Sequence, residues 1–359
     1  QYKNTHQDPS TGNSRVVTLT EIVDSGSNAG SNDNVSALSI ASTVTLAATN
    51  DAPTATAGTT LAYSENGTAA VVDNTIALSD ADDSQMAGAS VTISSGFTSG
   101  DILTFTDTAN ITGSYNSGSG VLTLSGSDTT ANYQAALRSI TYASSSEDPT
   151  TTATSRTISW TVTDGNSDGA GAETSTAVTS TINLTAVNDA PVTTAGATLA
   201  YSENGTAAVI DNTIALSDID DSQMAGASVT ISSGFTSGDT LGFTTIGAIS
   251  GSYNSSTGVL TLSGTDTIAN YQAALRSITY ASSSEDPTAT AASRTISWSV
   301  TDANSDGAGA QSSSAVTSTI NLTATNDTPT ATAGATLAYS ENGTAAVVDN
   351  TIALSDADD

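Results

Sequence analysis

Apolar residues fall in short runs in which every second position is apolar, and turn-forming residues separate the runs. The pattern is clearest at Ile158, Trp160 and Val162, and in residues 121–124, which lie between two glycines. Such alternation is typical of a β-strand with one buried and one solvent-facing side. Within one stretch it predicts strands at 60–63, 71–72, 75–78, 90–93, 102–105, 121–124, 139–142, 157–163 and 177–184.

One segment departs from this alternation. Tyr133, Leu137 and Ile140 fall at helical spacing, which predicts a short helix within residues 130–140. Short strands with one buried face, joined by turns, predict an all-β fold and favour a β-sandwich over a closed barrel. Trp160 and its counterpart Trp298 are predicted to lie in the core, because the residues two positions away are also apolar.

The whole pattern repeats. The stretch that begins at Asn50 returns at Asn188 and again at Asn326, a period of 188 − 50 = 326 − 188 = 138 residues. Residues 50–187 and 188–325 differ at only 24 of these 138 positions. A unit of this length suits a whole domain. We therefore expect two full repeats at 50–187 and 188–325, the last part of a diverged repeat at 1–49, and the first part of another at 326–359. The chain is interpreted as a window on a longer array.

The charge is strongly one-sided. The chain has 36 Asp and Glu against 6 Lys and Arg, a formal net charge of −30, and no cysteine. Nucleic acid and anionic membrane surfaces are excluded as partners, because both require clustered basic residues. The only lysine is Lys3 and the only histidine is His6, so the rest of the chain lacks the amine and imidazole side chains that enzymes often use in catalysis. No enzymatic activity is expected. No apolar run approaches the roughly 18 residues of a membrane helix.

The acidic residues gather at the ends of the predicted strands. Without nearby lysine such clusters repel, and a bound divalent cation would neutralise them. Oxygen-only ligands that mix carboxylate, amide and backbone groups favour Ca²⁺. The alternative is that these residues form turns and keep the chain soluble. The candidate ligands are Glu65, Asp80, Asp82, Asp164, Asn188, Asp189, Glu203, Asp218, Asp220, Asp302, Asn326 and Asp327.

The spacing of these groups resembles the calcium-binding pattern of cadherin repeats and of their bacterial cadherin-like relatives in large secreted adhesins. The matching residues are Asn188, Asp189 and Pro191, then Glu203, then Asp218, Asp220 and Asp221. The resemblance implies tandem cadherin-like sandwiches in an extended rod, with Ca²⁺ at each joint. It implies that Glu65 comes from the lower domain, Asn188 and Asp189 from the linker, and Asp218, Asp220 and Asp302 from the upper domain. Ala186 departs from the pattern, since the family has an acidic residue there.

These observations predict a non-enzymatic stalk of a secreted bacterial surface adhesin or extracellular fibre, with joints stiffened by Ca²⁺. Its expected partners are calcium ions and neighbouring repeats, and like chains in a fibre or surface glycans. Two alternatives stay open: an array of glycan- or cell-binding modules, and a self-assembling filament. The recurring arginines are predicted to pair with carboxylates of the repeat; they are Arg138, Arg156, Arg276 and Arg294.

Overall fold

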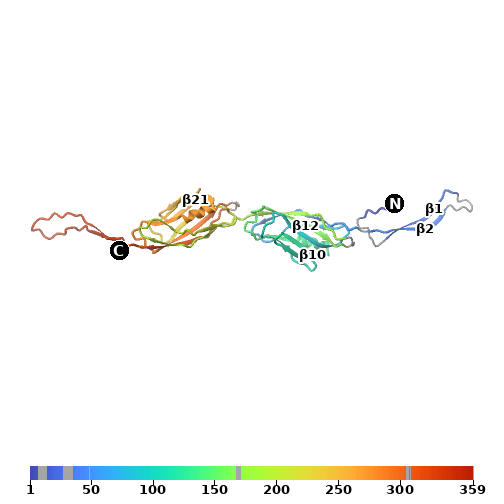
Figure 1. The fold of residues 1–359 in the computed structure, drawn as a ribbon, viewed down its shortest axis with the longest axis horizontal. Helices are drawn as coiled ribbons and strands as arrows, with labels where there is room; N and C mark the ends of the chain where they lie inside the picture. Colours follow the sequence, from blue (N-terminus) through green and yellow to red (C-terminus); the bar gives the residue numbers. More distant parts are fainter. Residues whose placement is uncertain are drawn as a thin grey trace. The chain divides into compact units, whose positions relative to one another are not determined.

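The computed structural model describes residues 1–6, 14–26, 35–47, 49–166, 171–304, 307 and 309–358. The chain divides into two compact units, residues 1–186 and 187–359. The described elements are nearly all strands, which confirms the all-β fold predicted from the sequence (Figure 1).

The described residues of the first unit form thirteen strands and one helix. They are β1 (Arg15–Val23), β2 (Val35–Val44), β3 (Thr54–Thr56), β4 (Thr60–Ser64), β5 (Ala70–Val71), β6 (Ala77–Ser79), β7 (Gln85–Ser95), β8 (Asp101–Thr104), β9 (Thr112–Asn116), β10 (Val121–Thr129), α1 (Thr130–Arg138), β11 (Thr141–Ser144), β12 (Ser155–Asp164) and β13 (Val178–Thr185).

The second unit repeats the elements from β3 to β13, without counterparts of β1 and β2, and adds a last strand pair. Its elements are β14 (Val192–Thr194), β15 (Thr198–Ser202), β16 (Ala208–Val209), β17 (Ala215–Ser217), β18 (Gln223–Ser233), β19 (Asp239–Gly242), β20 (Ser250–Asn254), β21 (Val259–Thr267), α2 (Ile268–Arg276), β22 (Thr279–Ser282), β23 (Ser293–Asp302), β24 (Val316–Thr323), β25 (Thr330–Thr332) and β26 (Ala353–Ser355).

Each unit contains a sandwich of a large and a small sheet. In the first, a six-stranded sheet runs in the order β4-β13-β12-β7-β10-β9 and a three-stranded sheet in the order β5-β11-β8. The strands β4 and β13 pair in parallel, whereas the other pairs are antiparallel. The second unit has the same orders with β15-β24-β23-β18-β21-β20 and β16-β22-β19. The two sheets of each unit stay separate, so the sandwich interpretation holds and a barrel does not form.

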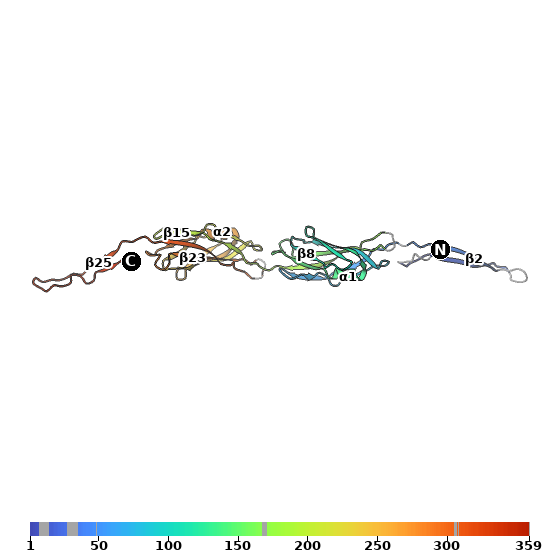
Figure 2. The same ribbon diagram turned by 90° about the horizontal axis from the view of Figure 1, so that it is seen from below.

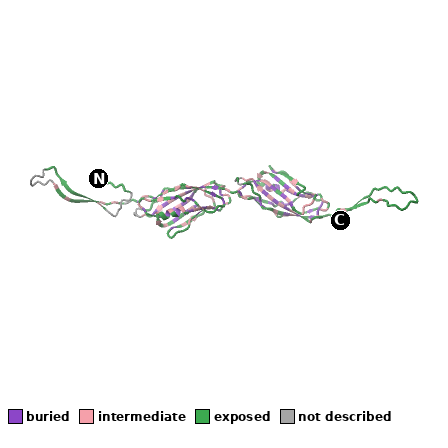
Figure 3. Cartoon of the chain, turned by 180° about the vertical axis from the view of Figure 1, so that it is seen from behind, coloured by how far each residue is buried: buried purple, intermediate pink, exposed green. Residues whose placement is uncertain are grey.

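The core lies between the two sheets and follows the predicted alternation. Along β12 buried and half-buried residues alternate without interruption, with Ile158, Trp160 and Val162 fully buried. Figure 3 shows that the buried residues gather within the sandwich of each unit. Trp160 Nε1 donates a hydrogen bond to Ser180 Oγ at 3.0 Å, which satisfies its one polar atom inside the core. Trp298 occupies the same place in the second unit. The core position predicted for both tryptophans is confirmed.

The predicted short helix is also confirmed. Thr129 caps α1, its side chain accepting the N–H of Asn132, and Tyr133, Ala136 and Leu137 are buried in the core. Figure 2 shows α1 within the first unit. In each unit this helix packs on the strand next to the acidic loop, β6 in the first and β17 in the second. The helix therefore fixes one wall of each sandwich.

Two short strands, β3 and β9, were not predicted. The residues of β9 read TGSYN and contain a single large apolar side chain, so they carry no alternating apolar signal. This strand lies at the edge of the large sheet, where it needs to bury little of its surface and is fixed by main-chain pairing with β10.

The arginines divide into two kinds. Arg156 and Arg294 pair with the carboxylates of Asp101 and Asp239, as predicted. The prediction is wrong for Arg138 and Arg276, at the ends of the two helices: the Nε of each donates at 2.7 Å to a main-chain carbonyl, that of Ile76 or Ile214. In the described part of the chain neither has a carboxylate within ion-pair distance. Ile76 and Ile214 lie in the connection before β6 or β17, and the aspartate of that connection, Asp73 or Asp211, accepts main-chain N–H groups instead of the arginine.

Among the described residues four further sheets have two strands each: β3–β6 and β14–β17, whose strands belong to the repeats, and β1–β2 and β25–β26, which precede and follow them. The hairpin β1–β2 leaves apolar side chains such as Val16 and Ile40 more than half exposed, and β25 pairs with β26. Among the described residues no helix has both the length and the apolar character needed to span a membrane.

Candidate metal centres

An acidic loop follows β17 in the second unit. It contains Asp218, Asp220 and Asp221, which offer carboxylate oxygens within 4.8 Å of one another. Asp218 Oδ1 accepts the main-chain N–H groups of Asp220, at 3.3 Å, and Asp221, at 3.1 Å. The loop is thus wrapped around one carboxylate. Asp218 Oδ2 is buried and accepts no hydrogen bond in the structure.

Burial and the crowding of carboxylates in this loop raise the pKa of its first aspartate. Burial, and then the neighbouring side chain of Asp220, raise the pKa of Asp218 to about 7. In the first repeat burial likewise raises the pKa of Asp80, again next to an aspartate, Asp82. Carboxylates held this way accommodate negative charge poorly unless a cation joins them.

The start of each repeat is tied to its acidic loop by one hydrogen bond. The N–H of Asp189 donates to Asp220 Oδ2 at 2.7 Å. The same bond recurs between Asp51 and Asp82, at 2.9 Å, and between Asp327 and Asp358. The Asn-Asp dipeptide and the acidic loop, 31 residues apart, therefore come together in all three places.

The asparagine of this dipeptide binds a different carboxylate. Asn188 is 1% exposed, and its Nδ2 donates to Asp302 Oδ2 at 2.9 Å. Asp302 also accepts the N–H groups of Asn304 and Gln311. Asn50 and Asp164 repeat the side-chain contact in the first unit at 2.8 Å. Hydrogen bonds thus compensate the burial of Asp302 and Asp164, whereas Asn188 Oδ1 is buried and accepts none.

A second carboxylate group, the Glu203 cluster, consists of Glu203, Glu285 and Asp327. Oxygen atoms of the three lie within 4.8 Å of one another. Glu203 follows β15 in a turn that Asn204 closes with a φ of 57°, in the left-handed region that asparagine tolerates. Glu285 comes from the loop after β22, and Asp327 follows β24. The cluster joins three segments that lie far apart in the sequence.

Glu203 is the buried member of this cluster. It is 6% exposed, and its Oε2 accepts the N–H of Thr325 at 2.8 Å, while its Oε1 accepts no hydrogen bond in the structure. Glu285 is exposed and its Oε2 accepts a weak bond from Asn204 Nδ2 at 3.4 Å. Asp358 Oδ2 accepts the N–H of Asp327, whereas Asp358 Oδ1 is buried and accepts no hydrogen bond in the structure.

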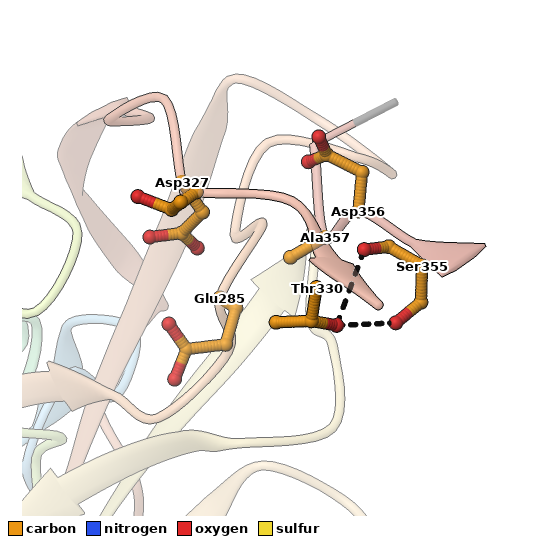
Figure 4. Close-up of a pocket in the computed structure, with 7 residues that line it drawn as sticks. Glu285, Asp327, Thr330, Ser355, Asp356 and Ala357 are labelled. Atoms are coloured by element: carbon orange, nitrogen blue, oxygen red, sulfur yellow. Dashed lines mark hydrogen bonds between the residues drawn. The ribbon is translucent and has the colours of Figure 1, made fainter. Parts of the chain in front are cut away.

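Beside the cluster lies a hollow. It is lined by Glu285, Asp327, Thr328, Thr330, Ser355, Asp356 and Ala357. In Figure 4 Glu285 and Asp327 lie on one side of it, and Thr330 and Ser355, which are joined by hydrogen bonds, lie on the other. The hollow gives solvent and ions access to Glu285 and Asp327 of the cluster.

The electrostatics of the cluster are unbalanced. Desolvation, and then the negative charges of Glu203, Asp358 and Glu285, raise the pKa of Asp327. Residues 187–359 contain only two basic side chains, Arg276 and Arg294. Arg294 pairs with buried Asp239 and Arg276 binds a main-chain carbonyl, so neither neutralises the cluster.

Sequence reasoning missed one member of this cluster. Glu203 and Asp327 were among the predicted ligands, but Glu285 was not. Its signal was the SEDP segment, which recurs at 146–149 and 284–287. The sequence alone did not show that this loop lies beside the turn of Glu203, 82 positions earlier.

Asn326 is exposed, and its Nδ2 donates to the main-chain oxygen of its neighbour Asp327. The counterparts of the cluster 138 positions earlier are Glu65, Glu147 and Asp189.

Comparison with known proteins shows similarity in sequence to halomucin. No family model matches the chain. Halomucin from Haloquadratum walsbyi is 35% identical over 128 residues, which is 34% of this chain and 1% of halomucin. The chain thus spans a very small part of the length of that relative.

By structure, the chain is similar to cadherin ectodomains. Mouse cadherin-23 domains EC22–24 give a TM-score of 0.37 at 12% identity, covering 87% of this chain and 79% of that one. Human CDH23 EC21–23 gives 0.32 at 13% identity, covering 84% and 83%. Protocadherin gamma B2 domains 1–5 give 0.30 at 15% identity, covering 96% and 52%.

Proposed function

We propose that the chain is a structural segment of an extracellular protein in which Ca²⁺ stiffens the joint after each sandwich. The observation that carries the proposal is the Glu203 cluster, where three carboxylates from three separate segments meet without a basic side chain. Carboxylates do not gather in this way for their own stability, because they repel.

The residues present suit calcium. The donors are carboxylate oxygens, including the buried Glu203 Oε1, and the cluster contains no histidine or cysteine. A hard cation that takes six to eight oxygens in flexible geometry fits such a set, whereas Mg²⁺ needs fewer protein ligands and a stricter octahedron. Glu203, Glu285 and Asp327 would hold the ion, with Asp358 and Asp356 nearby. When bound, the ion supplies the positive charge that the cluster lacks.

The mechanical consequence follows from where these residues sit. Glu203 and Glu285 belong to turns of the second sandwich, and Asp327 belongs to the chain that leaves it. The departing chain is bonded to two carboxylates, because the N–H of Thr325 donates to Glu203 and the N–H of Asp327 donates to Asp358. Holding all three acids together would fix the direction in which the chain leaves the sandwich. The binding free energy then appears as stiffness of this joint.

The recurrence of the same residues extends the proposal to the other repeats. Glu65, Glu147 and Asp189 stand 138 positions before Glu203, Glu285 and Asp327. Partial similarity to halomucin and to cadherin ectodomains supports an extracellular location and a structural or adhesive role. Calcium at about 1 mM, the range in which extracellular modules bind it, would keep such joints loaded outside the cell.

Thermal unfolding of the whole chain tests this proposal, with about 1 mM Ca²⁺ or with a chelator. We expect Ca²⁺ to raise the melting temperature and an equal concentration of Mg²⁺ to raise it less. Small-angle scattering on the same samples measures whether Ca²⁺ narrows the range of dimensions that the chain adopts. An unchanged melting temperature and unchanged scattering would indicate that the acidic residues form turns and keep the chain soluble, and do not bind Ca²⁺.

A further inference from the structure

The first sandwich carries a hollow between the β8–β9 connection and α1. Its volume is about 450 Å³, within the range of small-molecule sites. Its lining residues are Phe105, Thr106, Thr108, Ala109, Asn110, Asp128, Asn132, Ala135, Ala136 and Ser139. All of them lie far in sequence from the acidic loop and from Glu65.

This hollow coincides with the region where the two repeats differ most. Of the 24 differences between residues 50–187 and 188–325, seven fall within residues 102–112. The longest run of consecutive differences is 107–110, where DTAN in the first repeat corresponds to TIGA in the second. The residues on the helix side, from Asp128 to Ser139, keep their counterparts at every lining position. The helix side is therefore common to both repeats, whereas the loop side differs at Thr108, Ala109 and Asn110.

The exchanged residues change what this region contains. Ile246, the counterpart of Thr108, packs against the core of the second sandwich. Asp266 Oδ2 there accepts the main-chain N–H of Ala248 at 2.8 Å, which bonds the loop directly to the end of β21. In the first repeat Asp128 Oδ2 instead accepts the side chain of Asn110, at 3.3 Å. A long bond from an exposed amide is easily exchanged for a bond to a ligand.

The chemistry of the hollow narrows the kind of ligand. Phe105 and three alanines are its apolar lining residues, and the polar groups of Asn110, Asp128 and Asn132 line it together with threonine and serine hydroxyls. Asp128 Oδ1 already accepts the N–H groups of Thr129, at 2.8 Å, and Asn132, at 2.7 Å. A single carboxylate engaged in this way is a poor cation site. An anion is disfavoured by the net charge of −30 and by the absence of a basic side chain among the lining residues.

We infer that this hollow binds a neutral sugar residue, and that the second repeat does not. A pyranose has an apolar face of C–H groups, which suits Phe105 and the alanines. Its hydroxyls both donate and accept, which suits the carboxylate of Asp128 and the amides of Asn110 and Asn132. The chain would then hold a glycan through one repeat while its neighbour, with Ile246 in place, acts as a spacer.

Saturation-transfer NMR on the full chain tests this inference, with the methyl glycosides of glucose, galactose, mannose, N-acetylglucosamine and N-acetylgalactosamine as probes. We expect transfer to the ring protons of at least one of them. The variant D107T/T108I/A109G/N110A carries the loop of the second repeat and should lose that transfer. Because the second repeat folds with these residues, the variant should keep the melting temperature of the parent. T108I alone is the fallback if the full exchange does not fold.

The reciprocal variant T245D/I246T/G247A/A248N should bind a second equivalent of the same glycoside. The inference is overturned if none of the five glycosides shows transfer, or if the loop-exchanged variant retains it. Retention would show that the signal arises elsewhere on the chain. Since the hollow shares no residue with the Glu203 cluster, this outcome is independent of whether Ca²⁺ binds.

Discussion

Arg156 and Asp101, 55 positions apart in the sequence, form an ion pair with an Nε–Oδ2 distance of 2.7 Å and no exposed side-chain surface. The arginine also donates to the carbonyl of Pro149 and the aspartate also accepts the hydroxyl of Tyr142 at 2.6 Å. The pair thus joins the small sheet, through β8, to the large sheet, through β12. Arg294 and Asp239 repeat it in the second unit.

Breaking one such pair should lower the free energy of unfolding of its sandwich. Asp101→Asn leaves the buried guanidinium without its counter-charge, which costs about 3–5 kcal/mol. Urea denaturation, followed by the fluorescence of the core tryptophans, measures this loss. Arg138→Met is the control, because Arg138 makes one bond to a carbonyl and should cost only about 1 kcal/mol. Equal losses in the two variants would contradict a special role for the pair.

Acid should destabilise both sandwiches through one buried aspartate in each. Burial by itself would raise the pKa of Asp211, but hydrogen bonds from Thr213, Ala197, Gly196 and Ser318 outweigh it and hold the pKa well below its usual range. Hydrogen bonds outweigh burial at Asp73 in the same way. A depressed pKa in the folded state contributes stability above the unfolded value of about 3.9, and this contribution is lost as the pH falls below that value.

The free energy of unfolding should therefore decline between about pH 4 and pH 2. The variant D211N, combined with D73N, should be less stable at neutral pH but should show a flatter decline in this range. Denaturation at a series of pH values, in the presence of a chelator, measures both. A decline as steep as that of the parent chain would assign the acid sensitivity to other carboxylates.

Neutralising the Glu203 cluster should have opposite effects with and without calcium. The variant E203Q/E285Q removes two of three mutually repelling charges while glutamine keeps an oxygen for the N–H of Thr325. In chelator it should be at least as stable as the parent chain, and the rise in melting temperature with Ca²⁺ should shrink. Calorimetry measures both temperatures.

The matched control for that variant is Glu173→Gln. It removes a carboxylate outside the cluster, and the second repeat carries glutamine, Gln311, at this position. It should keep the full response to Ca²⁺. If E203Q/E285Q also keeps it, the proposed ligands are not those that bind the ion.

Features that depend on neighbouring residues could be predicted from the sequence, whereas contacts between residues far apart in the sequence could not. Alternation predicted the buried face of β12 and helical spacing predicted α1, because both depend on neighbouring residues. The partner of Arg156 and the place of Glu285 depend on how the sheets and turns pack, which no local pattern encodes. The four-residue difference at 107–110 was readable in the sequence, but its meaning depends on the helix that faces it.

Hydrogen exchange offers the most local view of the proposed joint. The N–H of Thr325 donates to Glu203 and that of Asp327 donates to Asp358. Both amides should exchange more slowly with Ca²⁺ than with chelator, because holding the carboxylates together keeps their acceptors in place. The N–H groups of Gly196 and Ala197, which donate to Asp211 inside the sandwich, are the internal control and should not change. Slowing at all four amides would indicate a general stabilisation of the fold. Slowing at none would show that Ca²⁺ does not bind at this joint.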